Sequence, residues 1–189
     1  FVFVGRLVRD KGINELVEAF HRLHSEYPNT RLLLVGEMEQ DLDPLKPETL
    51  NEIKHNDFIE AVGRQSDVRP WLAAADALVF PSYREGFPNV VIEAGAMGLP
   101  SIVTDINGSR EIIIEGRNGV IIPPRDTEAL YNAMKRMAVT PTEASAMGAA
   151  AGTLIASRYE QTYVRRCLKE FYNEILRKPI DPVSRQSSK

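Results

Sequence analysis

The chain has 189 residues, of which 43% are hydrophobic and 26% are charged, as in an ordinary globular protein. Its formal net charge of −3 argues against general nucleic-acid binding. No apolar run approaches the roughly 20 residues that span a bilayer, and the one cysteine, Cys167, can form no disulfide within the chain. These features indicate a protein of a reducing compartment, and we expect it in the cytoplasm.

Short apolar segments alternate with helical patterns along the chain, which is typical of an α/β fold with a parallel sheet. Six segments are short and almost entirely apolar, as in strands that are covered on both faces. These predicted strands are residues 1–4, 31–35, 58–62, 77–80, 101–104 and 120–122. Helices are predicted at residues 13–26, 47–55, 67–74, 88–97, 108–114, 127–138, 142–157 and 158–176. We therefore expect a Rossmann-like open sheet of about six parallel strands with helices on both faces.

The chain is predicted to form one domain over residues 1–178, followed by a polar tail over residues 179–189. In open parallel sheets, ligands bind beyond the carboxyl ends of the strands, where the strand order reverses. Gly5, Gly36 and Pro81 each directly follow a predicted strand. Motifs that are far apart in the sequence are thus predicted to meet at this edge.

The first motif at this edge is residues 5–12, with the sequence GRLVRDKG. Gly5 permits a sharp turn after the strand, and Arg6 and Lys11 bracket that turn. Arginine offers a planar fork of donors that suits phosphate oxygens, and lysine offers a compact positive charge. The motif suggests a phosphate-binding loop, and a solvent-exposed basic loop is the alternative. Arg9 is interpreted as a surface residue.

The second motif, residues 85–94, contains the start of a predicted helix. Pro88 suits the first position of that helix, because its φ is fixed and its missing N–H would be unpaired there. The amides of Asn89, Val90 and Val91 would then be free donors at the positive end of the helix dipole. Such a helix start is a suitable binding site for an anion.

The same motif carries two glutamates, Glu85 and Glu93. Glu93 lies one helical turn after the helix start, on the face of Asn89 and Val90. Because a carboxylate repels phosphate, we expect neutral hydroxyl groups as its partners, as on a sugar. The motif therefore suggests a sugar phosphate ligand. A capped core helix and a glycosidase with paired carboxylates are the alternatives.

Four motifs in this order resemble retaining glycosyltransferases of family 4, which have the two-domain GT-B architecture. The motifs are residues 5–12, 85–94, 98–100 and 115–119, and the resemblance covers roughly residues 1–140. It implies that the chain is the carboxyl-terminal, donor-binding half of such an enzyme. The amino-terminal, acceptor-binding domain is expected to lie outside the chain.

The resemblance implies a role for each matching residue. Arg6 and Lys11 match a pair that binds the diphosphate of a nucleotide sugar, and Glu85 matches a residue that binds hydroxyls of the donor sugar. These three residues are the predicted catalytic set. Gly86 and Phe87 are assigned to the donor-binding site with them.

The outer parts of the donor are assigned in the same way. Glu93 matches a residue that binds the ribose hydroxyls, and the amides of Asn89 and Val90 match donors to phosphate. Arg64 matches a loop position that lies against the nucleotide base.

One segment departs from the family pattern. Family members often have a second glycine soon after the one that matches Gly36, whereas residues 37–40 of this chain read EMEQ. Because this loop is acidic, a close approach of its backbone to a nucleotide is not predicted here.

The resemblance implies that a sugar is transferred, with retention of configuration, from a UDP or GDP sugar to a saccharide or lipid-linked acceptor. Polysaccharide or glycoconjugate biosynthesis is the implied setting, in the cytoplasm or peripherally at the inner face of the membrane. No metal or other cofactor is implied, because two cationic side chains and a helix start already face the phosphates. The isolated chain is expected to bind a nucleotide weakly and to transfer little sugar.

Two other functions remain open from the sequence. A sugar-nucleotide epimerase of the same architecture would keep the phosphate site but use different carboxylates. A non-catalytic nucleotide-binding or scaffold module would have no physical need for both glutamates and both basic residues.

Overall fold

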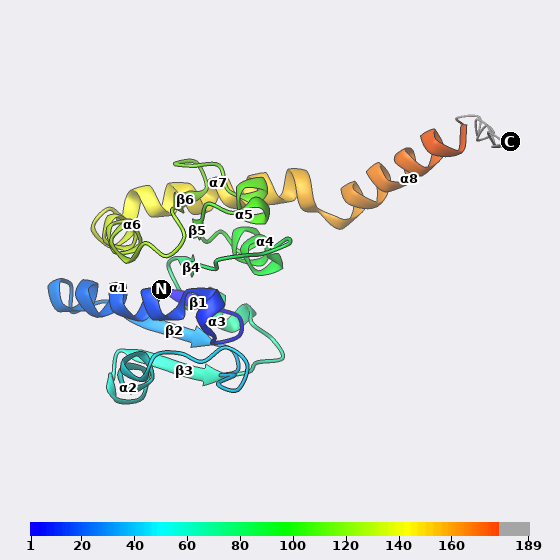
Figure 1. Cartoon of the computed structure of the whole chain (residues 1–189). Coiled ribbons are helices and arrows are strands. Elements are labelled where there is room, and N and C mark those ends of the chain that lie inside the picture. Colours follow the sequence, from blue (N-terminus) through cyan, green and yellow to red (C-terminus); the bar gives the residue numbers. More distant parts are fainter. Residues whose placement is uncertain (178–189) are drawn as a thin grey trace, which may run out of the picture. The chain divides into compact units, whose positions relative to one another are not determined.

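The computed structural model describes residues 1–177 (Figure 1), so the polar tail predicted at residues 179–189 lies outside the described residues. The chain divides into two compact units, Phe1–Ala156 and a second unit that begins at Ser157. The domain predicted over residues 1–178 therefore includes parts of both units.

The first unit is built on a parallel sheet, and six strands are present in the described residues. The strands are β1 (Val2–Val4), β2 (Leu32–Val35), β3 (Ile59–Gly63), β4 (Leu78–Phe80), β5 (Ser101–Thr104) and β6 (Gly119–Ile122). Their spatial order is β3-β2-β1-β4-β5-β6. This is the Rossmann-like order, and it confirms the predicted fold class.

Helices connect the strands, and two more, α6 and α7, follow β6. They are η1 (Arg9–Lys11), α1 (Ile13–Glu26), α2 (Pro47–His55), α3 (Arg69–Ala73), α4 (Asn89–Ala96), α5 (Asn107–Ile112), α6 (Thr127–Val139) and α7 (Pro141–Tyr159). Helices α1 and α2 lie in the connections from β1 to β2 and from β2 to β3, which run toward the β3 edge of the sheet. Helices α3 to α5 lie in the connections from β3 to β4, β5 and β6 in turn, which run toward the β6 edge. Because such crossovers are right-handed, the two groups cover opposite faces. Helix α6 packs against α1, and Gly95 of α4 packs against Ile155 of α7.

The core lies between the sheet and these helices. In α1, the residues Leu16, Phe20 and Leu23 recur at helical spacing and are fully buried. Phe3 of β1 stacks on Phe80 of β4 with ring centroids 5.8 Å apart. The strands at the centre of the sheet are therefore fixed by apolar packing on both faces.

Helix α6 begins at a side-chain cap. The Ala129 amide donates to the carboxylate of Asp126, the residue before the helix, over 2.8 Å. This cap satisfies one of the amides that a helix start leaves unpaired. It holds the end of the segment that follows β6.

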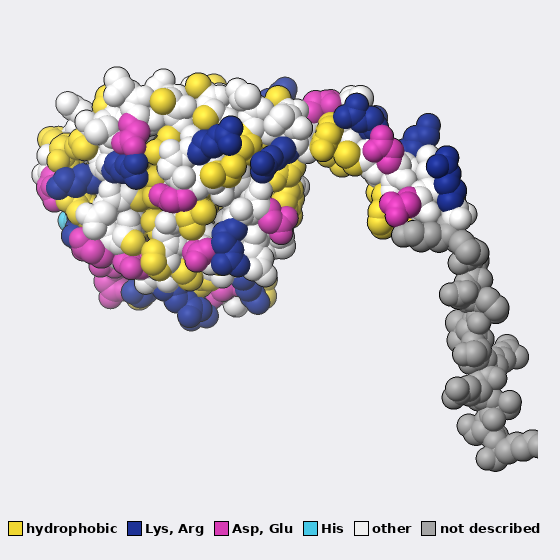
Figure 2. Space-filling model, turned by 90° about the horizontal axis from the view of Figure 1, so that it is seen from above, with side chains coloured by type: hydrophobic (Ala, Val, Ile, Leu, Met, Phe, Trp, Pro, Cys, Tyr) yellow, Lys and Arg dark blue, Asp and Glu magenta, His cyan; other side chains and the backbone are white. Residues whose placement is uncertain are grey.

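Charge is mixed on the visible surface of the first unit. On the face shown in Figure 2, lysine and arginine side chains are interspersed with aspartate and glutamate. A continuous basic stripe, which nucleic-acid binding would need, is not formed on that face.

The second unit contains α8 (Gln161–Arg177). Its apolar residues Val164, Leu168, Phe171 and Ile175 recur at helical spacing and form one apolar stripe along the helix.

Candidate functional site

The strand order of the sheet reverses between β1 and β4, which lie side by side. The loop after β1 and the loop after β4 are in direct contact there. A Cβ atom on Gly12 would lie 2.2 Å from the carbonyl oxygen of Pro81, and the Tyr83 amide donates to the Asp10 carbonyl over 2.8 Å. The topology thus brings together two motifs that are more than 70 residues apart, as in Lys11 and Glu85.

Lys11 and Glu85 form the centre of this arrangement. The Lys11 ammonium group donates to the Glu85 carboxylate, and the side chains are only 17% and 16% exposed. The Ser82 hydroxyl donates to the same carboxylate over 2.8 Å. The Lys11 Nζ atom also lies 5.8 Å from the ring centroid of Phe80. A ligand could separate this pair: its anionic group would bind Lys11 in place of Glu85, and its hydroxyl group would bind Glu85 in place of Lys11.

Further contacts hold the loop after β4 against the first motif. The Tyr83 hydroxyl donates to Glu15 over 2.7 Å, and Arg84 pairs with Asp10 at 2.6 Å. Burial and the neighbouring Glu15 raise the pKa of Tyr83, so its hydroxyl stays a neutral donor. The position of Glu85 is therefore set by contacts on both sides of it in the sequence.

Arg6 does not lie free over the sheet edge. Its Nη1 atom donates to Glu39 Oε2 over 2.9 Å, and the two side chains are 57% and 27% exposed. Glu39 belongs to the acidic loop that departs from the family pattern. Arg6, which is predicted to bind the diphosphate, thus has a carboxylate partner within the described chain.

The acidic loop is attached to the first motif through its backbone. The Leu7 amide donates to the Glu37 carbonyl over 2.7 Å, and Leu7 bridges to Met38 in parallel. A Cβ atom on Gly36 would lie 1.8 Å from the Gly5 carbonyl oxygen, so only glycine permits this approach. The loop therefore forms a wall beside Arg6.

The same wall continues through Asp43. Its carboxylate accepts a hydrogen bond of 2.6 Å from the Asp10 amide and pairs with Arg9 at 3.0 Å. Arg9, which was predicted to be a surface residue, is exposed but paired.

The start of α4 differs from the prediction by one position. Helix α4 begins at Asn89, so Pro88 precedes the first helical residue instead of occupying it. Its extended backbone, with φ −79° and ψ 98°, lets its carbonyl accept from the Val91 amide over 3.1 Å. The prediction of three free amides is therefore wrong for Val91. Within residues 1–177 the amides of Asn89 and Val90 have no acceptor.

Helix α5 supports the segment that precedes this helix start. A Cβ atom on Gly108 would lie 2.4 Å from the Gly86 carbonyl oxygen and 2.9 Å from Pro88 Cδ. Because these neighbours are a backbone carbonyl and a rigid proline ring, the contact allows little displacement. The packing of Gly108 thereby fixes the segment that leads into α4.

The remaining predicted residues lie at the open surface. Arg64 follows β3 and Gly63, whose φ is +69°, and its side chain is exposed. Glu93 is exposed on α4, and Phe87 is 41% exposed. In the described part of the chain neither Arg64 nor Glu93 forms an ion pair. A ligand could therefore reach both from solvent.

Two residues of the site were not found from the sequence. Ser82 was not assigned to the site from the sequence, but it is fully buried and its hydroxyl donates to Glu85. Its place two residues after β4, at the reversal point, was the available signal. Glu39 gave only the signal of an unusual acidic loop, because its pairing with Arg6 depends on the path of that loop.

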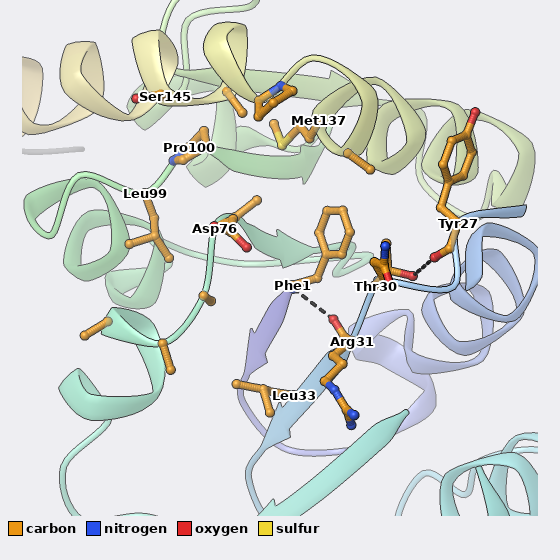
Figure 3. Close-up of a pocket in the computed structure, with 18 of the residues that line it drawn as sticks. Phe1, Tyr27, Thr30, Arg31, Leu33, Asp76, Leu99, Pro100, Met137 and Ser145 are labelled. Atoms are coloured by element: carbon orange, nitrogen blue, oxygen red, sulfur yellow. Dashed lines mark hydrogen bonds between the residues drawn. The ribbon is translucent and has the colours of Figure 1, made fainter. Parts of the chain in front are cut away.

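A separate hollow lies at the opposite end of the strands (Figure 3). It has a volume of about 1460 Å³ and is lined by residues that precede the strands, among them Phe1, Arg31, Asp76 and Pro100. The Arg31 carbonyl accepts from the Phe1 amino group over 2.9 Å. None of the predicted site residues lines this hollow. Since ligands of such sheets bind at the carboxyl ends of the strands, we place the site at the Lys11–Glu85 edge.

Residues 1–177 also lack two features. No helix in this range is long and apolar enough to cross a membrane. In the same range, no group of three or more His, Cys, Asp or Glu side chains is placed to hold a metal ion.

Comparison with known proteins gives consistent relatives. The capsular polysaccharide biosynthesis glycosyltransferase CapM of Staphylococcus aureus is 27% identical over 93% of this chain and 46% of its own length. A glycogen synthase of Mycobacterium tuberculosis is 30% identical over 90% of this chain and 41% of its own length. The chain thus spans less than half the length of these relatives.

The fold is shared with solved structures as well. The crystal structure of Anabaena Alr3699/HepE in complex with UDP superimposes with a TM-score of 0.83 at 21% identity, over 92% of this chain and 48% of that one. The family model for group 1 glycosyl transferases matches residues 1–140, which contain the whole Lys11–Glu85 edge. With the Rossmann-like order and the motifs of both loops in place, the chain belongs to the group 1 glycosyltransferases.

Proposed function

We propose that the full-length protein transfers a sugar from a nucleoside diphosphate sugar to an acceptor, with retention of configuration, in polysaccharide or glycoconjugate synthesis. The chain described above supplies the donor site. Family membership and the kinship with CapM, a capsular polysaccharide biosynthesis glycosyltransferase, support this proposal. The observation that carries it is the joining of Lys11 to Glu85 beside the unpaired amides of α4.

The reaction depends on the departure of the diphosphate. The bond between the sugar C1 and the diphosphate oxygen breaks, its electron pair stays on the oxygen, and positive charge develops on the sugar ring. Lys11, Arg6 and the amides of Asn89 and Val90 stabilise the negative charge that grows on the leaving group. The two amides are held in place by the helix start and need little reorganisation in the transition state, whereas Lys11 turns from Glu85 and Arg6 from Glu39 when the donor binds.

The two glutamates hold the neutral parts of the donor. Glu85 accepts hydrogen bonds from hydroxyls of the transferred sugar when Lys11 turns to the diphosphate. Glu93 accepts from the ribose hydroxyls, and Arg64 lies against the base. Gly86 and Phe87 contribute the short segment between the sugar and phosphate positions. UDP or GDP is the proposed nucleotide, and the HepE structure holds UDP on the same fold.

The central experiment replaces Lys11 by alanine in the full-length protein. We expect a loss of roughly 3–4 kcal/mol of transition-state stabilisation, or about 100- to 1,000-fold in kcat. The matched control is Arg9→Ala, which removes a basic side chain from the same loop; among residues 1–177, Arg9 pairs with Asp43 and not with Glu85. Near-normal turnover of Lys11→Ala would sink the proposal.

Other functions are separated by two assays. Incubation with the donor alone, followed by analysis of the sugar, detects an epimerase, because an epimerase changes the donor without any acceptor. Calorimetry with UDP, GDP and ADP tests nucleotide binding, and binding of none would favour a scaffold. Proton spectra of the fresh product give its anomeric configuration, and inversion would refute the retaining assignment.

We propose that no metal cofactor takes part, because two cations and two helix amides supply the charge that the diphosphate needs. Activity is then expected to withstand a chelator such as EDTA. Loss of activity with EDTA and recovery with a divalent cation would contradict this part of the proposal.

We also propose that the reaction takes place in the cytoplasm, at or near the inner membrane face, and uses a saccharide or lipid-linked acceptor. The acceptor would bind the part of the protein outside this chain. Fractionation of cells, with and without a salt wash, tests for peripheral association. Recovery only from an extracellular fraction would contradict it.

A further inference from the structure

We propose that Glu39 competes with the donor diphosphate for Arg6 and thereby lowers the affinity of donor and product, and this inference rests on the proposed function. Glu39 accepts a 2.9 Å hydrogen bond from the Arg6 guanidinium group. Arg6 is the cation that the diphosphate would approach from the open side, since its side chain is 57% exposed. The Glu39 carboxylate is therefore bound to the guanidinium group that the diphosphate needs as its partner.

The backbone fixes Glu39 in this position. Arg6 precedes Leu7 and Glu39 follows Met38, and Leu7 and Met38 form a parallel bridge. The amide of Leu7 also donates to the Glu37 carbonyl over 2.7 Å. The acidic loop is thus paired with the phosphate loop, and this pairing brings Glu39, diagonally across the bridge, within hydrogen-bond distance of Arg6.

The strength of the contact suits a competitor that can be displaced. An ion pair with this much solvent exposure is weak, so a doubly charged diphosphate can replace the single carboxylate. A singly charged phosphate ester gains less from Arg6 and must still overcome the same carboxylate. Glu39 thereby lowers the affinity of every anion that binds Arg6, and the diphosphate can meet this cost because it gains more from Arg6.

Release of the product is affected in the same direction. When the sugar has been transferred, the nucleoside diphosphate must leave a site that carries Arg6, Lys11 and the α4 amides. Glu39 can return to Arg6 and replace the departing phosphate as its partner. Without Glu39, the diphosphate product would be held more tightly.

The test measures UDP and GDP affinity by calorimetry in the full-length protein. We expect Glu39→Gln to bind the preferred nucleoside diphosphate roughly 2- to 5-fold more tightly, and to lose this gain at high salt. The matched control is Glu37→Gln, which removes the same charge from an exposed neighbour in the same loop. Competitive inhibition of turnover by UDP or GDP is expected to strengthen by the same factor.

A second background shows whether the effect acts through Arg6. In Arg6→Ala protein, Glu39→Gln is expected to change affinity no more than Glu37→Gln does. If Arg6→Ala weakens binding but Glu39→Gln leaves it unchanged or weakens it, the competitor role is overturned while the donor site stands. If no nucleoside diphosphate binds to the unmodified protein, or if Arg6→Ala has no effect, the proposed function and this inference fall together.

Discussion

The Lys11–Glu85 pair gives the sharpest test of the site in the absence of any substrate. Replacing Lys11 by methionine keeps a long apolar stem beside Phe80 but removes the charge. Among the described residues, Glu85 then keeps the Ser82 hydroxyl, at 2.8 Å, as its one side-chain partner, and its side chain is 16% exposed. The variant therefore leaves a carboxylate that is largely shielded from water and has lost its counter-charge.

The magnitude follows from the burial of the pair. A hydrogen bond to a charged group contributes about 1.5–3 kcal/mol when shielded, and a fully exposed ion pair contributes far less. With exposures of 17% and 16%, Lys11 and Glu85 lie near the shielded case. We expect Lys11→Met to lower the free energy of unfolding by about 2 kcal/mol, which lowers Tm by about 4–8 °C in a domain of this size.

The assay is a double-mutant cycle by chemical denaturation with Lys11→Met, Glu85→Gln and the double variant. Because the double variant removes both charges, we expect it to be more stable than the sum of the single losses predicts, with a coupling energy of about 1.5–2.5 kcal/mol. The control cycle uses the exposed pair Arg22 and Glu128, which should show much weaker coupling. A coupling energy near zero at Lys11–Glu85 would refute the reasoning.

Three further predictions concern the framework of the site and are checked by denaturation. Phe20→Ala removes a fully buried ring, so we expect a loss of about 3–5 kcal/mol, and a loss under 1 kcal/mol would contradict the packing. Gly36→Ala places a Cβ atom 1.8 Å from a backbone carbonyl oxygen, with an expected loss of at least about 2 kcal/mol. Gly98→Ala, with φ +79° but no neighbour closer than 4.0 Å, is its control and should lose less. Asp126→Ala removes the cap on the Ala129 amide and should lower the free energy of unfolding by about 1 kcal/mol. An unchanged free energy of unfolding would contradict a stabilising role of the cap.

Most of the fold could be predicted because its elements are short, apolar and clearly bounded. The strand predicted at residues 101–104 matches β5, and α1 and α2 match their predicted ranges. Ends without a breaker were less accurate: the seventh helix continues to Tyr159 and not 157, since its alanine-rich sequence contains no stop signal. The single turn η1 that carries Lys11 was not predicted.

The site could be predicted only in part, for a different reason. The meeting of Lys11 and Glu85 follows from topology, because both leave neighbouring strands at the same sheet edge. The pairing of Arg6 with Glu39 follows from the route of one loop, and no periodicity encodes that route. The shift of Pro88 by one position shows the same limit, since the helix start depends on the backbone angles of the turn before it.

The contacts that hold the Lys11–Glu85 edge together all lie within Phe1–Ala156, from the loop after β1 to the support from Gly108 in α5. Such a self-contained arrangement makes this unit a module, because its site geometry can be inherited without the segments that choose an acceptor. Relatives named for capsular polysaccharide and for glycogen are similar to the chain over this unit, at 27% and 30% identity. If the proposed function holds, evolution can therefore change what receives the sugar while leaving the Lys11–Glu85 edge intact.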